Sequence, residues 1–251
     1  MEGGADAGEP CEASHSPRAM AAAEALDTIC TLAVTAAQIE DLDALGGLAV
    51  DMARDLVGAD EAWLYLWHEP RQVLAPIATN EPNGSLSRCG TLLPGQRVTG
   101  SAFESDQPIL IRDYPRSRFA MPGLVAQGLK SSVAVPLLSG GRRVGALCAQ
   151  SYSYLGWTPE HGRLLWVLGS LLGPTLEASQ RRARRASIDL TPREEQILAG
   201  IMAGQPAKSI ARAEGIAEAT VRVHIRSLLN KFGVNSQLAA AAMARDLGIG
   251  I

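Results

Sequence analysis

The C-terminal part of the chain reads LTPREEQILAGIMAG at 190–204 and KSIARAEGIAEATVRVHIRSLLNKFGV at 208–234. In both segments, apolar residues recur at the spacing of short amphipathic helices, and turn residues separate these helices. The helix that we expect from Glu218 has one apolar stripe, formed by Val221, Ile225, Leu228 and Phe232. This pattern predicts a small all-α module of short helices at 190–251.

The face opposite this stripe carries Arg222, Val223 and Arg226. The two arginines are one helical turn apart. An arginine fork matches a guanine edge or a phosphate, and a valine can contact a thymine methyl group. A short helix at 207–213 and a turn at 214–217 precede this helix, which is the order of a helix-turn-helix motif. The periodicity alone also allows an ordinary helix pair with a solvated arginine face.

Four short motifs carry a family resemblance: TPRE at 191–194, KSIA at 208–211, TVRVHI at 220–225 and KFGVNS at 231–236. Together they resemble the DNA-binding domain of the LuxR family of bacterial regulators, a four-helix helix-turn-helix domain. The resemblance implies contacts to DNA bases from Arg222, Val223 and Arg226, and contacts to the DNA backbone from Lys208, Thr220 and Lys231.

Two positions depart from this family pattern, and one helix has an open role. Ala207 stands where the family usually has Asn, and Gln237 where many members have Arg, so we expect weaker phosphate contact. The resemblance implies that the alanine-rich helix at 236–247 pairs two modules on DNA. The alternative is that this helix only closes the core of its own module.

The N-terminal region predicts an α+β domain with a central antiparallel sheet flanked by helices. We expect helices at 26–38 and 41–57, the second capped by Asp41 and Gly58, and a long helix from Thr158 to about Arg185. Strand-like segments lie at 62–67, 73–79, 109–111, 132–138 and 144–152; the first two and the last two are expected to form hairpins. We divide the chain into a disordered tail (1–19), this domain (20–180), a linker (181–189) and the helical module (190–251).

Several passages of this domain resemble a GAF domain, among them LVGAD at 56–60, PGQRVTG at 94–100, PILI at 108–111 and GLKSSVAVPL at 128–137. The resemblance spans roughly 40–180 and implies a pocket between one sheet face and the segments at 86–128. It implies that Trp63 points into the pocket, and strand alternation adds Tyr65. The further candidates are Phe119 and Met121 as apolar wall, and Arg88 or Arg112 as anchors for an anion.

Two aromatic side chains in one pocket would suit a flat or aromatic effector. The alternative is that they only fill the core and that the domain serves only to dimerise. We expect no cofactor: neither Cys89 nor Cys148 has the adjacent His of many bilin-binding relatives, and no metal-ligand spacing is present.

We expect the protein not to be an enzyme. Certain GAF relatives reduce methionine sulfoxide, but that chemistry needs thiols within disulfide reach, and the sequence does not bring Cys89 and Cys148 together. A thiol redox sensor is a further alternative. A response regulator would need alternating strands and helices, which this order of helices and hairpins does not provide.

The composition is that of a soluble globular protein, with 47% hydrophobic residues and a formal net charge of −3. No apolar run is long enough for a membrane span, and the first residues do not resemble a signal peptide, so we expect a cytoplasmic protein. The expected partners are a second copy of the chain, double-stranded DNA with an inverted-repeat site, a small-molecule effector, and RNA polymerase if the protein is an activator.

Overall fold

The N-terminal domain is built on one five-stranded sheet in this computed structural model, which describes residues 22–81, 90–153 and 157–250. Its strands are β1 (Glu61–His68), β2 (Val73–Thr79), β3 (Ile109–Ile111), β4 (Ser131–Ser139) and β5 (Arg142–Ser151). Their order is β2-β1-β5-β4-β3, and every neighbouring pair is antiparallel. Both predicted hairpins, β1–β2 and β4–β5, are confirmed.

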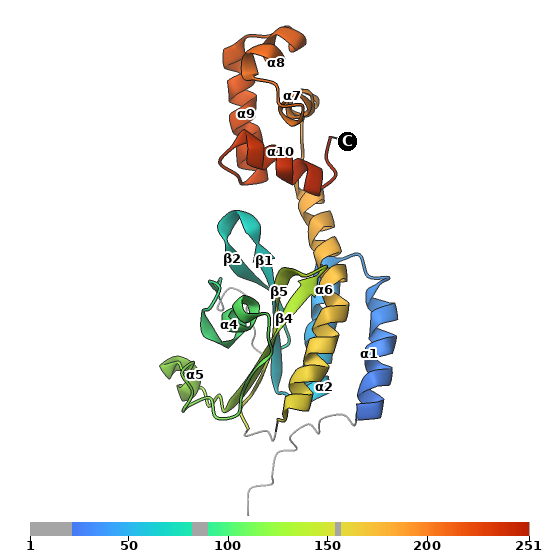
Figure 1. Cartoon of the computed structure of the whole chain (residues 1–251), viewed down its shortest axis with the longest axis vertical. Helices are drawn as coiled ribbons and strands as arrows, with labels where there is room; N and C mark the ends of the chain where they lie inside the picture. Colours follow the sequence, from blue (N-terminus) through green and yellow to red (C-terminus); the bar gives the residue numbers. More distant parts are fainter. Residues whose placement is uncertain (1–21, 82–89, 154–156, 251) are drawn as a thin grey trace, which may run out of the picture.

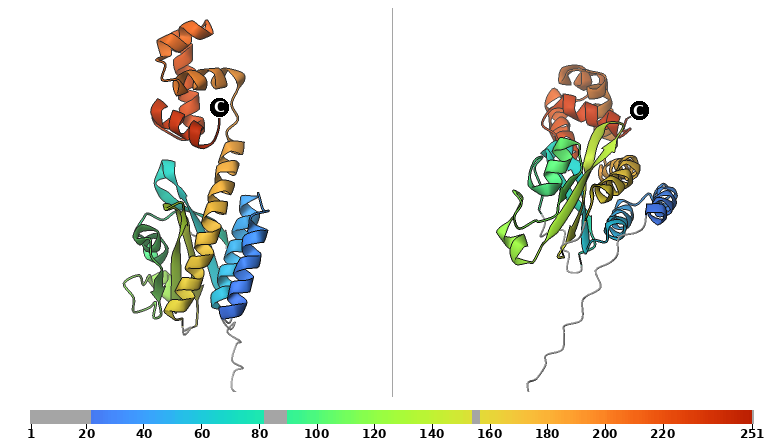
Figure 2. Two further views of the ribbon diagram at one scale, coloured as in Figure 1. Left: turned by 45° about the vertical axis from the view of Figure 1, so that its right-hand side comes forward. Right: turned by 60° about the horizontal axis from the view of Figure 1, so that its bottom comes forward.

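Helices cover both faces of the sheet (Figures 1 and 2). One face packs on α2 (Leu42–Val57) and α6 (Pro159–Ser187), with α1 (Ala22–Ala36) lying beside them. The other face is covered by α4 (Arg97–Ser105), and α5 (Pro122–Ala126) lies on the same side. The strands therefore have two buried faces, which gives the domain two hydrophobic clusters, one on each side of the sheet.

The helix ends follow the capping residues of the sequence. The Asp41 side chain accepts the Ala44 N–H at 2.7 Å, and Gly58 ends α2 with φ +62°. Thr158 and His161 form a capping box at the start of α6. The helix α6 then runs without interruption through Gly173-Pro174 to Ser187, so it includes most of the segment expected to be a linker.

The C-terminal domain has the four expected helices: α7 (Pro192–Met202), α8 (Ala207–Glu214), α9 (Glu218–Phe232) and α10 (Gln237–Asp246). They enclose a separate core that contains the whole predicted stripe of α9. Ala240, Ala241 and Ala244 of α10 are buried in the same core, so α10 does close its own module. This domain lies beyond the C-terminal end of α6 (Figure 1), where Arg181 forms an ion pair with Asp246 at 3.2 Å.

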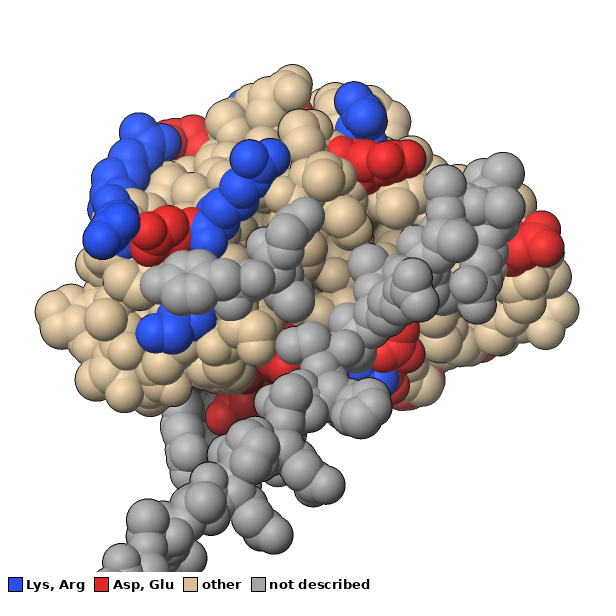
Figure 3. Space-filling view, turned by 90° about the horizontal axis from the view of Figure 1, so that it is seen from below, with Lys and Arg blue, Asp and Glu red and all other residues tan. Residues whose placement is uncertain are grey.

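The opposite end of the molecule, away from the C-terminal domain, carries both signs of charge. Viewed from that end, Lys and Arg side chains lie beside Asp and Glu rather than forming one continuous basic surface (Figure 3). Within 22–81, 90–153 and 157–250, no helix has the length and apolar character to cross a membrane.

Candidate nucleic-acid interface and ligand cavity

The helices α8 and α9 form the motif that the sequence predicts. Gly215 ends α8 with φ +66°, a conformation that glycine adopts without steric cost, and the chain turns directly into α9. The Ile216 N–H donates to the Ala211 carbonyl at 3.1 Å and fixes the turn. Because Val221, Ile225, Leu228 and Phe232 are buried, the orientation of α9 about its own axis is set by the core.

The candidate base-contacting residues lie on the exposed face of α9. Arg222, Val223 and Arg226 are all exposed, and Val223 retains 66% of its accessible surface despite being apolar. Arg222 forms an ion pair with Glu218, one turn earlier, at 2.6 Å. Thr220 at the start of α9 and Lys208 at the start of α8 are exposed as well. Five of the six candidate DNA contacts therefore have accessible side chains without an interaction that ties them into the core.

The sixth candidate, Lys231, is bound within its own domain. Its Nζ lies 2.7 Å from Glu194 Oε2 and 2.6 Å from the Asp189 carbonyl oxygen. Glu194 is buried and also accepts hydrogen bonds from the Thr191 N–H at 2.9 Å and the Ser227 hydroxyl at 2.7 Å. Burial opposes ionisation of Glu194, but these donors outweigh it and lower its pKa to about 2. The Lys231 ammonium already neutralises a buried carboxylate. The expected contact from Lys231 to DNA stays a prediction.

The N-terminal domain contains a cavity of about 270 Å³ between the sheet and the segments that follow β2. Trp63, Tyr65 and Met121 line it. Leu64 and Leu66 instead belong to the cluster on the opposite face of the sheet, which packs on α2 and α6. The alternation along β1 thus places the aromatic pair on the cavity side.

The remaining candidates lie elsewhere. Phe119 lines a neighbouring hollow, with the Arg118 guanidinium 4.7 Å from its ring centre. Arg112 is outside the cavity lining, and its Nε donates to the Trp157 carbonyl at 2.9 Å. Arg88 lies outside the described residues. Trp67, the next residue on the same face of β1, stacks on Phe103 with ring centres 5.0 Å apart and does not line the cavity.

The cavity also contains polar residues that the sequence did not reveal. Glu61 is only 3% exposed; Oε1 accepts the Trp63 indole N–H at 3.2 Å, and Oε2 accepts the Tyr152 hydroxyl at 3.1 Å. Burial raises the pKa of Glu61. Arg97, the first residue of α4, also lines the cavity. Glu61 is the first residue of β1, and residues 62–67 that follow it are apolar or aromatic; a charged residue at the start of such a strand is the one cue that could have identified it.

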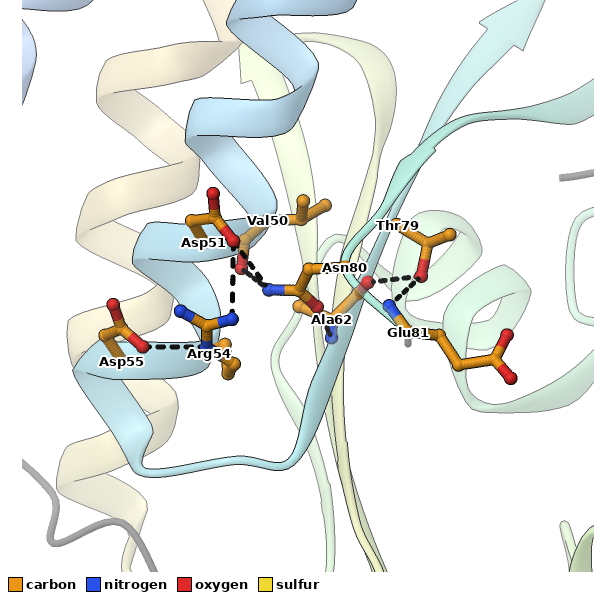
Figure 4. Close-up of polar contacts among 8 residues, drawn as sticks. All are labelled: Val50, Asp51, Arg54, Asp55, Ala62, Thr79, Asn80 and Glu81. Atoms are coloured by element: carbon orange, nitrogen blue, oxygen red, sulfur yellow. Dashed lines mark hydrogen bonds and ion pairs between the residues drawn. The ribbon is translucent and has the colours of Figure 1, made fainter. Parts of the chain in front are cut away.

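Glu81 is held at the cavity by the network that follows β2 (Figure 4). The neighbouring Asn80 side chain accepts the Ala62 N–H at 2.7 Å and donates to the Val50 carbonyl at 3.1 Å, so it joins α2 to β1. The Glu81 N–H donates to the Thr79 hydroxyl at 3.1 Å, and its side chain points away from α2.

Of the two cysteines that the structure describes, Cys30 and Cys148, the second lies on the cavity side of the sheet with Trp63 and Tyr65. It is buried in β5, paired across the ladder with Trp63, and its Sγ lies 3.5 Å from the Ser132 hydroxyl. Burial raises the pKa of Cys148, which disfavours the nucleophilic thiolate. Cys89 lies outside the described residues. Among the described side chains, no group of His, Cys, Asp and Glu is arranged to hold a metal ion.

Two family models match the chain. The GAF domain matches residues 40–177, and the luxR family of bacterial regulatory proteins matches residues 189–244. The chain is 45% identical over 80 residues to the nitrate/nitrite response regulator protein NarL of Escherichia coli K12, covering 30% of this chain and 37% of that protein. It is 40% identical over 68 residues to the transcriptional regulatory protein MctR of Rhizobium johnstonii, covering 27% and 32%. The chain therefore spans about a third of the length of these curated relatives, 32% to 37%.

Solved structures agree on the N-terminal fold. The free methionine-R-sulfoxide reductase from Neisseria meningitidis superposes with a TM-score of 0.56 at 20% identity, covering 68% of this chain and 99% of that chain. The GAF domain of a phosphoenolpyruvate-protein phosphotransferase from Coxiella burnetii gives a TM-score of 0.56 at 20% identity, covering 64% and 96%. Identities at this level establish the fold alone. The chain belongs to the GAF domain family, and its C-terminal domain belongs to the luxR family of bacterial regulatory proteins.

Proposed function

We propose that this protein is a DNA-binding transcriptional regulator whose GAF domain senses a small molecule. The observation that carries the proposal is the exposed face of α9, where Arg222, Val223 and Arg226 stand opposite a fully buried stripe. A helix held in this way can enter the major groove with its arginines toward the base edges. Lys208 and Thr220 would contact phosphates beside it. Since DNA is the proposed partner, the proposed site of action is the cytoplasm.

We propose that the regulator acts as a homodimer. Exposed apolar side chains lie on the side of the N-terminal domain formed by α1 and α6: Val34 on α1, and Val167 and Leu171 on α6. A second copy of the chain could cover them. In the C-terminal domain, Leu238 of α10 is 82% exposed, so α10 retains an apolar contact in addition to those that close its own core. A two-fold dimer would favour an inverted-repeat site, and an activator would also contact RNA polymerase.

We propose a sensor rather than an enzyme. Reduction of a sulfoxide through thiols would need a reactive cysteine at the cavity; among the described residues the candidate is Cys148, which is buried and has a raised pKa. The same property disfavours redox sensing by this thiol. The cavity supports a sensing role over dimerisation alone, because it has internal space and buried polar groups beside its aromatic walls.

The test begins with selection of preferred duplexes from a random pool by the full-length protein. Affinity for the selected duplex is then compared between the wild type and Arg222→Ala, with Arg116→Ala as the matched control. Arg116 is an exposed arginine in the segment between β3 and α5, outside the DNA-binding domain and outside the helices proposed to pair. Loss of a base-contacting arginine should cost about 1–3 kcal/mol of binding free energy and relax the sequence preference. If Arg222→Ala keeps both affinity and preference, α9 does not read DNA through this face.

A further inference from the structure

We propose that the GAF cavity binds a small dipolar molecule, with an anionic group at Arg97 and an amine at Glu61 and Glu81. This inference rests on the sensing role proposed above and specifies the chemical class of the effector. Its basis is the presence of opposite charges in the wall of one aromatic cavity.

Arg97 has two properties that favour an anionic ligand. Its backbone φ is +59°, a left-handed conformation that side-chain-bearing residues rarely adopt, and such outliers are concentrated at functional positions. Its Nε is buried and, among the described residues, has no hydrogen-bond acceptor. A buried donor without an acceptor is costly, and the guanidinium fork matches a carboxylate. Arg97 is also the first residue of α4, and an anion is favoured at the N-terminus of a helix.

The acidic part of the cavity wall is formed by Glu61 and Glu81. Each Glu61 oxygen accepts one hydrogen bond, from Trp63 or Tyr152, although a carboxylate can accept about four in total. Glu61 therefore retains acceptor capacity toward the cavity. Burial raises its pKa, and the nearby carboxylates of Glu81 and Asp60 add to this shift. The positive charge of an amine bound here would favour the ionised form of Glu61 and so offset both the burial and the neighbouring carboxylates.

The walls and the volume limit the rest of the ligand. Trp63, Tyr65 and Tyr114 contribute aromatic side chains to the lining, and an ammonium beside such rings gains cation–π attraction. The volume of about 270 Å³ lies just below the range of about 300–1,000 Å³ typical of drug-sized ligands. A compact amine-bearing acid fits these limits, whereas a dinucleotide or a tetrapyrrole exceeds them.

Calorimetric titration of the full-length protein with two matched sets of compounds tests this inference. One set is 4-(aminomethyl)benzoate, 4-methylbenzoate and 4-methylbenzylamine; the other is 5-aminopentanoate, pentanoate and pentylamine. In at least one set, the compound with both charges should bind about tenfold or more tightly than each analogue with one, since every charge-assisted contact contributes separately. The inference is overturned if neither dipolar compound binds, or if the singly charged analogues bind equally well.

Two substitutions locate the contacts. Arg97→Gln should abolish the advantage of the dipolar compound over the matched amine, and Glu61→Gln should abolish its advantage over the matched acid. Arg116→Gln and Glu104→Gln remove exposed charges outside the cavity lining and should leave both advantages unchanged. Tryptophan fluorescence during thermal unfolding checks the fold of each variant, and Glu81→Gln replaces Glu61→Gln if the latter does not fold. Unchanged selectivity in folded variants would contradict the assigned contacts.

Affinity for the selected duplex is measured in parallel, so that the two proposals fail separately. If the protein binds the duplex but not the dipolar compounds, the regulator stands and the ligand class is wrong. If the compounds bind but DNA does not, the cavity assignment stands and the regulator is wrong.

Discussion

Lys231 illustrates how one side chain can fit a sequence motif and have a structural role. Its ammonium contacts both Glu194 and the Asp189 carbonyl, and these contacts tie α9 to α7 and to the segment that precedes α7. Helical periodicity identified the exposed Arg222 and Arg226 of α9, whereas Lys208 of α8 was a candidate through the family resemblance. The sequence could not identify the partner of Lys231, because the two residues meet only when α7 packs against α9.

Among the residues that the structure describes, Lys208 has no such partner, and it should behave as a phosphate contact. The Lys208→Ala variant should weaken binding to all duplexes similarly. It should also lower the slope of log affinity against log salt by about one, because one fewer counterion is released. Fluorescence anisotropy at several salt concentrations, on the selected and on an unrelated duplex, measures both effects. A change confined to the selected duplex would show that Lys208 reads bases instead.

Glu194 should make the stability of the C-terminal domain dependent on acid. Its pKa is lowered from an ordinary 4.5 to about 2, so its stabilisation is complete above about pH 4.5 and is lost as pH falls toward 2. A shift of this size corresponds to about 3 kcal/mol. Amide hydrogen exchange of 192–232 in the full-length protein at pH 5 and pH 3, corrected for intrinsic rates, should reveal the loss. In Glu194→Gln this pH dependence should be much smaller; an unchanged one would contradict the assignment.

The close packing of α6 on β4 depends on a glycine. A Cβ at Gly173 would lie 2.2 Å from the Leu138 carbonyl oxygen, so the helix can approach β4 this closely only without a side chain at that position. Because the contact is with backbone, no rotamer change can relieve it. The helix is continuous through Gly173 and Pro174.

Gly173→Ala should destabilise the GAF domain by about 1–3 kcal/mol, the usual cost of overpacking. Gly162→Ala in the same helix is the control, since its Cβ would lie 3.7 Å from the Pro108 Cβ, an ordinary contact. That control should be neutral or more stable, because glycine disfavours helix. Urea unfolding followed by tryptophan fluorescence compares the two. Equal stability of both variants would show that β4 shifts to accommodate the methyl group.

The long helix α6 connects the GAF domain to the DNA-binding domain. It packs on β4 along the GAF domain, and near its C-terminal end Arg181 bridges Glu177 and Asp246, each at 3.2 Å. A ligand can shift the DNA-binding domains only if it binds one of their arrangements more tightly than another. The ion pair between Arg181 and Asp246 joins the two domains. If the C-terminal domain moves relative to the GAF domain, this contact changes.

Effector and DNA should therefore change each other's affinity by the same factor, because coupling between two sites is reciprocal. Titrations of each in the absence and presence of the other measure the two factors. Arg181→Ala should change the shared factor while leaving the affinity of the effector alone unchanged, with Arg116→Ala as the control. Mutually independent affinities would exclude communication between the domains.

Local sequence patterns were sufficient to predict most helices and strands and which face of α9 and of β1 points to the core or the cavity. Helix caps, hairpins and the alternation of β1 are local patterns, so Asp41, Gly58, the β1–β2 hairpin and the exposed face of α9 could be predicted from neighbouring residues. Which distant side chains meet could not be predicted from these local patterns and is seen only in the folded structure. Glu61, Arg97 and Tyr152 share one cavity because the strand order and the start of α4 bring them together, and Arg112 turns instead to Trp157. The reason is physical: periodicity fixes the direction of a side chain relative to its own element, whereas its neighbours depend on how the elements pack.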